Sequence, residues 1–68
     1  MEEVTIYHVV PDGDEWAVKK ENAERASFKS DTKEEALKRA RELGQDDKTT
    51  VVIHRKDGTI EEVINPRG

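Results

Sequence analysis

The sequence contains no cysteine, and its only histidines are His8 and His54. Disulfide bonds, thiolate metal sites and cysteine nucleophiles are therefore excluded, and a structural zinc site lacks sufficient ligands. No apolar run approaches the roughly 20 residues that are needed to span a bilayer. The start of the chain, Met1-Glu2-Glu3, is acidic and unlike a signal peptide, so we expect a cytoplasmic protein with no membrane partner.

Aromatic residues are also few: the chain has one tryptophan, one tyrosine and one phenylalanine, whereas charged residues make up 41% of it. The net charge of −4 favours solubility and works against unspecific binding to nucleic acid. Sixty-eight residues suffice for one domain, so we expect 1–68 to fold as a single unit. Because a core of this size rarely supplies more than about 3–5 kcal/mol, oligomerisation is an ordinary way to add stability.

The first part of the chain is typical of a β-hairpin. A β-branched run over residues 4–10 predicts a strand, and the following residues 11–14 (Pro-Asp-Gly-Asp) predict the loop of a hairpin. The return strand is expected at 16–20. A short third strand is expected at 25–28, on a weaker pattern.

The register of this first hairpin has two solutions in the sequence. A four-residue loop places Trp16 opposite Val9, with Tyr7 on the same face. A five-residue loop places Trp16 opposite Val10, beside His8. A slip of one residue exchanges the two faces of the sheet. The sequence alone leaves both solutions open.

The clearest pattern predicts a helix over 33–43. Thr32 and Glu35 have the spacing of a capping box, in which the threonine hydroxyl accepts a backbone N–H and the glutamate reaches back. An apolar stripe follows at Ala36, Leu37, Ala40 and Leu43. We expect Gly44 to end the helix in a left-handed conformation.

A second hairpin follows the helix. Residues 50–54 and 60–64 are predicted strands, and Asp57-Gly58 between them predicts a type I′ turn. Such a turn sets Arg55 opposite Ile60, Ile53 opposite Glu62 and Val51 opposite Ile64. The whole pattern predicts an α+β fold: a small two-layer sandwich in which two β-hairpins, with a short third strand, flank one α-helix packed on one sheet face.

Short motifs along the chain occur in the order seen in one bacterial family. They are Tyr7-His8-Val9-Val10-Pro11, Trp16-Ala17-Val18-Lys19, Ala23-Glu24-Arg25-Ala26-Ser27, Asp31-Thr32, Glu35-Ala36, Ala40-Arg41-Glu42-Leu43, Val52-Ile53-His54 and Asp57-Gly58-Thr59-Ile60. Together they resemble the family catalogued as domain of unknown function 2188, over residues 7–60. The resemblance implies a β-hairpin, helix, β-hairpin domain of bacteria and their phages, with no established activity to carry over. The regular caps and turns are also typical of a designed or consensus version of such a domain.

Chemistry-bearing motifs are missing, so we predict no enzyme activity, no catalytic residue, no cofactor and no metal. A candidate interaction face combines aromatic and basic side chains, namely Tyr7, Trp16, Lys19, Arg25 and Arg55. A sheet with such residues is one way to bind nucleic acid, but acids interleave with the bases here, which favours a solvated surface. For Trp16 the preferred interpretation is packing at the edge of the core.

The two histidines lie in separate predicted strands and are best interpreted as packing or exposed polar residues. If His8 and His54 met across the sheet they would form a pH-sensitive pair, but nothing in the sequence requires this.

One helix covers one face of a sheet, yet several of the predicted strands are apolar on both faces. Bare apolar area of this kind indicates a partner, and we expect a homodimer through the uncovered face. The predicted function is therefore a non-catalytic structural or interaction module. The alternative is a weak nucleic-acid-binding domain that uses the strand face.

Overall fold

The computed structural model of the chain describes residues 4–46 and 48–65, so the predicted domain limits at 1 and 68 lie outside the described residues. Five strands and one helix follow one another along the chain. They are β1 (Thr5–Asp12), β2 (Glu15–Lys20), β3 (Phe28–Ser30), α1 (Lys33–Leu43), β4 (Thr49–His54) and β5 (Ile60–Ile64).

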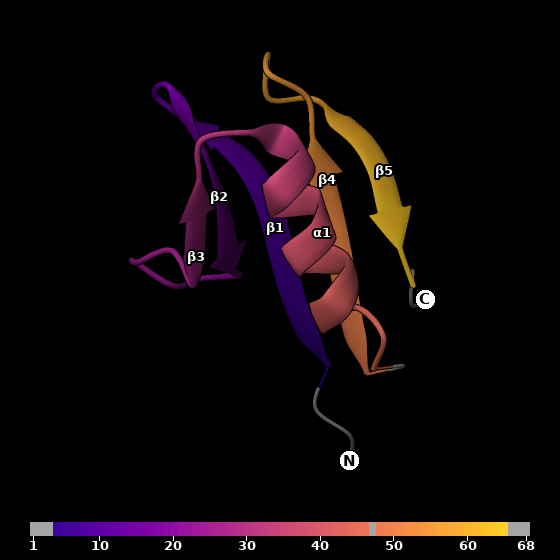
Figure 1. Cartoon of the computed structure of the whole chain (residues 1–68). Helices are drawn as coiled ribbons and strands as arrows, with labels where there is room; N and C mark the ends of the chain where they lie inside the picture. The colour runs from indigo at the N-terminus through magenta and orange to yellow at the C-terminus, as the bar shows by residue number, and fades with distance from the viewer. Residues whose placement is uncertain (1–3, 47, 66–68) are drawn as a thin grey trace.

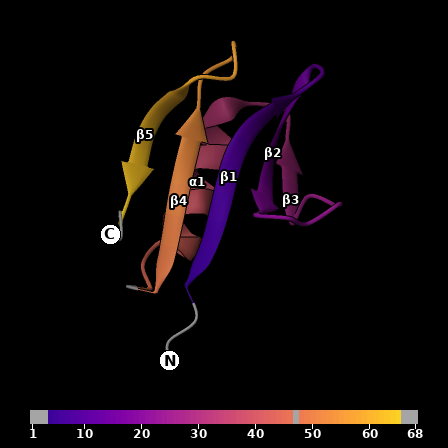
Figure 2. The same ribbon diagram turned by 180° about the vertical axis from the view of Figure 1, so that it is seen from behind.

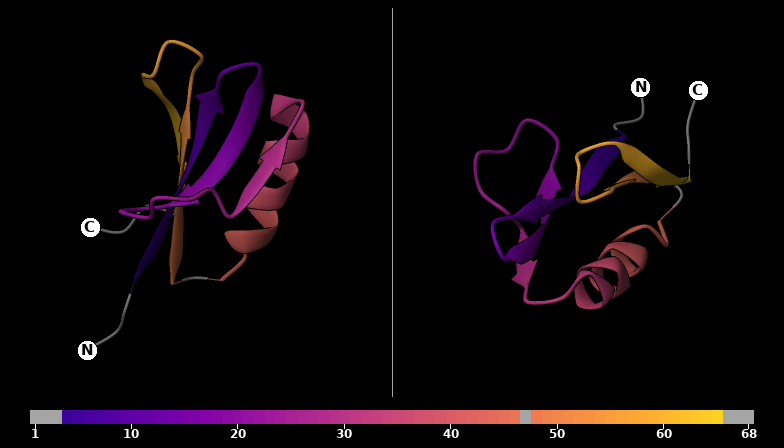
Figure 3. Two further views of the ribbon diagram at one scale, coloured as in Figure 1. Left: turned by 90° about the vertical axis from the view of Figure 1, so that its left-hand side faces the viewer. Right: turned by 90° about the horizontal axis from the view of Figure 1, so that it is seen from above.

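The strands form one mixed sheet in the order β3-β2-β1-β4-β5 (Figure 1). The two hairpins lie side by side because β1 pairs with β4 in parallel, while all other neighbours are antiparallel. The helix packs against one face of this sheet, as Figure 3 shows from two directions. The predicted α+β class with one helix on one sheet face is confirmed. The short third strand is present, at 28–30 rather than at 25–28.

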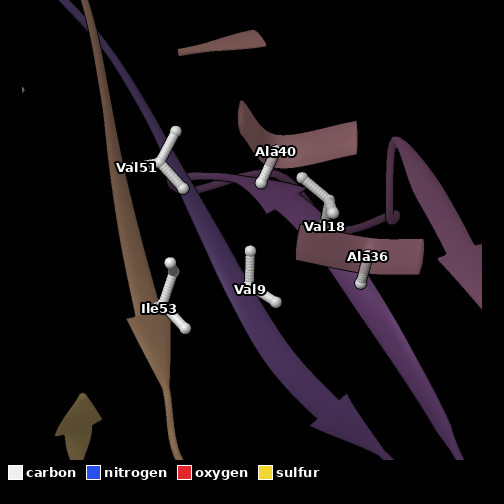
Figure 4. Packing of buried hydrophobic residues seen from close by; sticks show 6 residues of the cluster. All are labelled: Val9, Val18, Ala36, Ala40, Val51 and Ile53. Atoms are coloured by element: carbon white, nitrogen blue, oxygen red, sulfur yellow. The ribbon is translucent and has the colours of Figure 1, made fainter. Parts of the chain in front are cut away.

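The core lies between α1 and the sheet (Figure 4). Its fully buried members come from β1, β2, β4 and the helix: Val9, Val18, Ala36, Ala40, Val51 and Ile53. Two of the six are alanines, which let the helix approach the sheet closely but contribute little apolar area each. Larger apolar side chains that are partly buried pack around this cluster: Tyr7, Trp16, Phe28, Leu37, Leu43 and Ile64.

The first hairpin is tighter than either predicted register. Asp12 pairs with Glu15 around a two-residue turn, and Gly13 has a φ of +64°. Trp16 consequently lies opposite Pro11 rather than opposite Val9 or Val10, so both predicted pairings are wrong. Trp16 still shares its face with Val9, as the shorter predicted loop had it. The proline is tolerated within β1 because pairing with β4 ends at Val9, so no ladder bond to β4 is lost at Pro11.

The helix begins and ends where the sequence predicts. Thr32 caps it, since its hydroxyl oxygen accepts the backbone N–H of Glu35 at 3.2 Å. Gly44, however, is not left-handed, because its φ is −80°. A side chain at this position would approach Val51 Cγ2 to 3.2 Å. Glycine therefore serves close packing of the helix end on β4 rather than a left-handed stop.

The second hairpin also differs from the expected type I′ turn. Only Gly58 has a positive φ, +94°, and its N–H donates to the carbonyl of Arg55 at 2.9 Å. This is the hydrogen bond of an ordinary turn followed by one left-handed glycine, which leaves a bulge in the strand pair. Ile60 therefore lies opposite His54 instead of the predicted Arg55.

Candidate functional site on the open face of the sheet

The sheet has two faces with different surroundings. Odd-numbered residues of β1, such as Val9, point toward the helix, so even-numbered residues point to the opposite face. Among the described residues no other helix or strand covers this opposite face, and Figure 2 shows β1 and β4 lying in front of the helix. Loop residues 21–23 border the face next to His8 and Val10. We call this surface the open face.

Apolar side chains from three neighbouring strands gather on the open face. They are Ile6 and Val10 of β1, Val52 of β4, and Ile60 and Val63 of β5. The three on the central strands are half-buried, whereas Val63 is 38% and Ile60 is 56% exposed. The sequence predicted apolar residues on both faces of the central strands, and the strand pairing places them next to one another.

A pair of histidines lies among these apolar side chains. His8 on β1 and His54 on β4 approach so that His8 Nδ1 and His54 Nε2 are 3.0 Å apart. Their ring centroids are 5.3 Å apart and the rings are tilted by 33°. Parallel pairing causes this meeting, because His8 lies opposite Val52 and His54 follows two residues later on the same face.

Each outer ring nitrogen also has a partner. His8 Nε2 lies 3.2 Å from Glu21 Oε1, and His54 Nδ1 lies 3.0 Å from the carbonyl oxygen of Gly58. Glu21 is held beside β1 because its backbone N–H donates to the carbonyl of Ile6 at 2.7 Å. The result is a continuous chain of contacts from Glu21 through both rings to Gly58.

Counting protons along this chain gives its charge. Three contacts require three protons on nitrogen, because the glutamate carboxylate and the glycine carbonyl only accept. Two neutral imidazoles carry two N–H groups between them. The arrangement in which all three contacts are hydrogen bonds therefore holds one additional proton, which lies between His8 Nδ1 and His54 Nε2, with the Glu21 carboxylate as the counter-ion. In this state the His8–His54–Glu21 cluster has no net charge.

Basic residues gather at the other end of the open face. Lys19, Arg25 and Lys29 line a shallow depression of about 360 Å³ together with Asp12 and Glu24. Lys29 Nζ donates to Asp12 Oδ2 at 3.0 Å, and this hydrogen bond raises the pKa of the lysine. The depression thus mixes both signs of charge, and one of its three bases is already paired.

The five residues of the predicted interaction face do not lie on one face. Tyr7 and Trp16 pack against the core on the helix side, where the Lys33 ammonium lies 5.3 Å from the centre of the Trp16 ring. Lys19 is on the open face, opposite His8. Arg55 lies in the second hairpin and donates to the carbonyl of Ile60 at 2.9 Å. The interpretation of Trp16 as a packing residue is confirmed.

The sequence left open whether the two histidines meet, because this depends on which strands are neighbours. It gave no sign of the contact with Glu21, which depends on the register of β1 with β2. Within the part of the chain that the structure describes, no group of three or more His, Cys, Asp or Glu side chains is placed to hold a metal ion. No helix among the same residues is long and apolar enough to cross a membrane.

One helix on a five-stranded mixed sheet, with the other sheet face open, defines this chain as a two-layer α+β domain. By sequence it belongs to the family domain of unknown function 2188, described as an uncharacterized protein conserved in bacteria, whose model matches residues 7–65. The predicted resemblance is confirmed.

A relative in Bacillus subtilis (strain 168) is the uncharacterized protein YdaT, which is 42% identical over 57 residues. That match covers 84% of this chain but 38% of the relative, so the chain spans about two fifths of the relative's length. No solved structure matches the chain.

Proposed function

We propose that the domain is a non-catalytic interaction module that self-associates through the open face. The observation that carries this proposal is the contiguous group of apolar side chains on that face, above all Val52, Val63 and Ile60, with no described element over them. Central strands that are apolar on both faces are typical of a sheet that is covered twice, and here the side chains are fully buried on the helix side but only half-buried on the open face. A second copy of the chain would supply the second cover.

The area of the open face suits a weak dimer. Five strands spaced about 4.8 Å apart and about six residues long give a face about 24 Å wide and 20 Å long, near 500 Å² per copy. Two copies would bury about 1,000 Å², which is at the lower end of specific interfaces. Some charges on the face are compensated within the chain, namely Lys29 by Asp12 and, when it is protonated, His8 by Glu21, so a second copy needs no counter-charge for these two groups.

The occupied ring nitrogens support a non-catalytic role. All four nitrogens of His8 and His54 contact protein groups, so neither ring presents a free nitrogen as a base toward a substrate. A cytoplasmic location remains a prediction from the sequence. A designed or consensus origin is likewise still a prediction from the sequence, and it does not affect the choice of binding face.

Sedimentation equilibrium at high micromolar concentration tests the proposal. We expect the wild-type chain to show a monomer–dimer equilibrium, and Val63→Lys to weaken dimerisation at least tenfold, because the dimer would bury two copies of the new charge. Gln45→Lys is the matched control: it adds the same charge at an exposed position beyond the end of α1. A wild-type chain that stays monomeric, or a Val63→Lys variant that dimerises as well as Gln45→Lys, would overturn the proposal.

A second candidate, weak binding of nucleic acid, rests on the three bases around the depression, Lys19, Arg25 and Lys29. Against it, Tyr7 and Trp16 lie on the other side of the sheet and cannot stack on bases bound at that depression. An amide NMR spectrum with mixed single- and double-stranded nucleic acid at low salt separates the two functions. Shifts at these bases that vanish as salt rises would favour nucleic acid over the dimer.

A further inference from the structure

We propose that the His8–His54 pair is a proton gate for the open face, that is, that its protonation controls dimerisation. The dimer forms when the two rings share one additional proton, and it does not form when both rings are protonated. This inference rests on the proposed self-association and concerns its regulation. The pair lies on the two central strands of the sheet, beside Val10 and Val52, where a second copy would cover it. Its protonation therefore sets the charge that must be buried.

With one shared proton the cluster is suited to burial. Every ring nitrogen is hydrogen-bonded, and the positive charge on the rings is balanced by the Glu21 carboxylate in contact with His8. A charge that is paired and fully hydrogen-bonded costs much less to bury than an unpaired one. A second copy can therefore cover the two rings without leaving one of their N–H groups unbonded or a net charge on the cluster.

A second proton removes this balance. Both rings then carry two N–H groups, so His8 Nδ1 and His54 Nε2 are two donors that face each other at 3.0 Å and their hydrogen bond is lost. Two cations would share one carboxylate, and the cluster would carry a net positive charge. Covering that charge with a partner's apolar face is costly because it loses its water.

The charged groups around the pair do not balance the positive charge of the second protonated ring. From β2, Lys19 lies opposite His8 and adds positive charge to the same face. From the second hairpin, the Arg55 guanidinium is directed to the carbonyl of Ile60, and the Asp57 carboxylate accepts from Thr59. β5 places the apolar Ile60 opposite His54.

Proton linkage predicts how steep the response is. A dimer forms from doubly protonated monomers only if each copy releases one proton, which is two protons per dimer. In the pH range where the monomer takes up the second proton, the association constant therefore falls by up to about 100-fold per pH unit. We expect the association constant to fall tenfold or more between pH 7 and pH 5.

The test is sedimentation equilibrium of the wild-type chain and of His54→Asn from pH 7.5 to pH 5. Asparagine is chosen because its amide N–H reaches about as far as the ring Nδ1 and keeps the bond to Gly58, yet it does not titrate. We expect His54→Asn to dimerise at neutral pH and to lose the acid-induced fall, since His8 alone stays balanced by Glu21. A wild-type dimer that is unchanged between pH 7 and pH 5, or an equal fall in His54→Asn, would overturn the proton gate.

If the proposed self-association is wrong, the same experiment gives a different result. A wild-type chain that is monomeric at every pH refutes self-association, and with it a gate that acts on a dimer. Imidazole nitrogen NMR on the monomer then tells whether the single-proton pair itself exists. Rings of His8 and His54 that take up protons independently, as each does in a variant lacking the other, would show that the pair does not share a proton.

Discussion

Replacement of Gly44 by alanine tests whether glycine is needed there for packing or for a left-handed backbone. The φ of −80° is accessible to alanine, so the backbone itself opposes no substitution. An added Cβ would lie 3.2 Å from Val51 Cγ2 and 3.3 Å from the carbonyl oxygen of Ala40. Carbon atoms in good contact are about 3.5–4.0 Å apart, so something must move.

The neighbours of Gly44 have little freedom to move. Val51 is fully buried, and the Ala40 carbonyl already accepts the Gly44 N–H at 2.8 Å. Overpacking of this kind destabilises the folded state by about 1–3 kcal/mol. Alanine also reduces the conformational entropy of the unfolded chain, which stabilises the protein by about 0.4–1 kcal/mol. We therefore expect Gly44→Ala to lower the free energy of unfolding by about 1 kcal/mol. For a chain of this size that corresponds to a Tm lower by about 4–8 °C.

A double-mutant cycle with Val51→Ala identifies the cause. Urea unfolding of the four proteins is measured in one sucrose-containing buffer, which keeps the weakest variant folded. Because Val51→Ala removes the Cγ2 atom, Gly44→Ala should cost at least 0.5 kcal/mol less in that background, by roughly the usual coupling between residues in contact. An equal cost in both backgrounds, or a stabilised Gly44→Ala single variant, would refute the packing argument.

Two further predictions concern the start of the helix and its link to β5. Thr32→Ala removes the oxygen that accepts the Glu35 N–H and should cost about 1 kcal/mol in urea unfolding, while Thr32→Ser should stay within about 0.5 kcal/mol; equal losses would contradict the cap. The hydrogen bond from Lys33 lowers the pKa of Glu61. Because the folded pKa lies below the unfolded one, this pair stabilises the fold above the unfolded carboxyl pKa and stops doing so as pH falls through the folded pKa. Wild-type stability should therefore fall more steeply with acid than that of Lys33→Met, and parallel curves from thermal unfolding between pH 6 and pH 3 would argue against it.

The helix and most strands were predictable because their signals are local. The Thr32 cap depends on residues within one helical turn, and the apolar stripe of α1 depends on spacings of three and four residues. The second hairpin kept its predicted pairing of Val51 with Ile64 for the same reason, since alternation fixes the face of each side chain. Its turn type was mispredicted, because Asp57-Gly58 fits both a type I′ turn and a turn with a bulge.

Glycine and proline were less predictable, because their roles depend on distant neighbours. A glycine after a helix usually indicates a left-handed stop, but at Gly44 the deciding contact is with Val51 on another element. Pro11 was assigned to a loop because proline fixes φ at a value that suits a turn. It lies within β1 because the neighbouring strand β4 has already ended its pairing at that level.

The features of the candidate site also divide into those that local patterns predict and those that depend on distant parts of the chain. Sequence patterns alone established a two-layer α+β domain with apolar residues left over for a second sheet face, because alternation and helical spacing act between residues that are close in the chain. They could not say that β1 lies parallel to β4, since that pairing joins segments more than forty residues apart (the two histidines are separated by 46). The meeting of His8 with His54 follows from this pairing. The contact of His8 with Glu21 and the separation of Tyr7 and Trp16 from Lys19 follow instead from the register of β1 with β2, which the sequence left open. Strand order and register emerge only when the chain is folded, because they are set by packing of the whole sheet against the helix and not by any local preference.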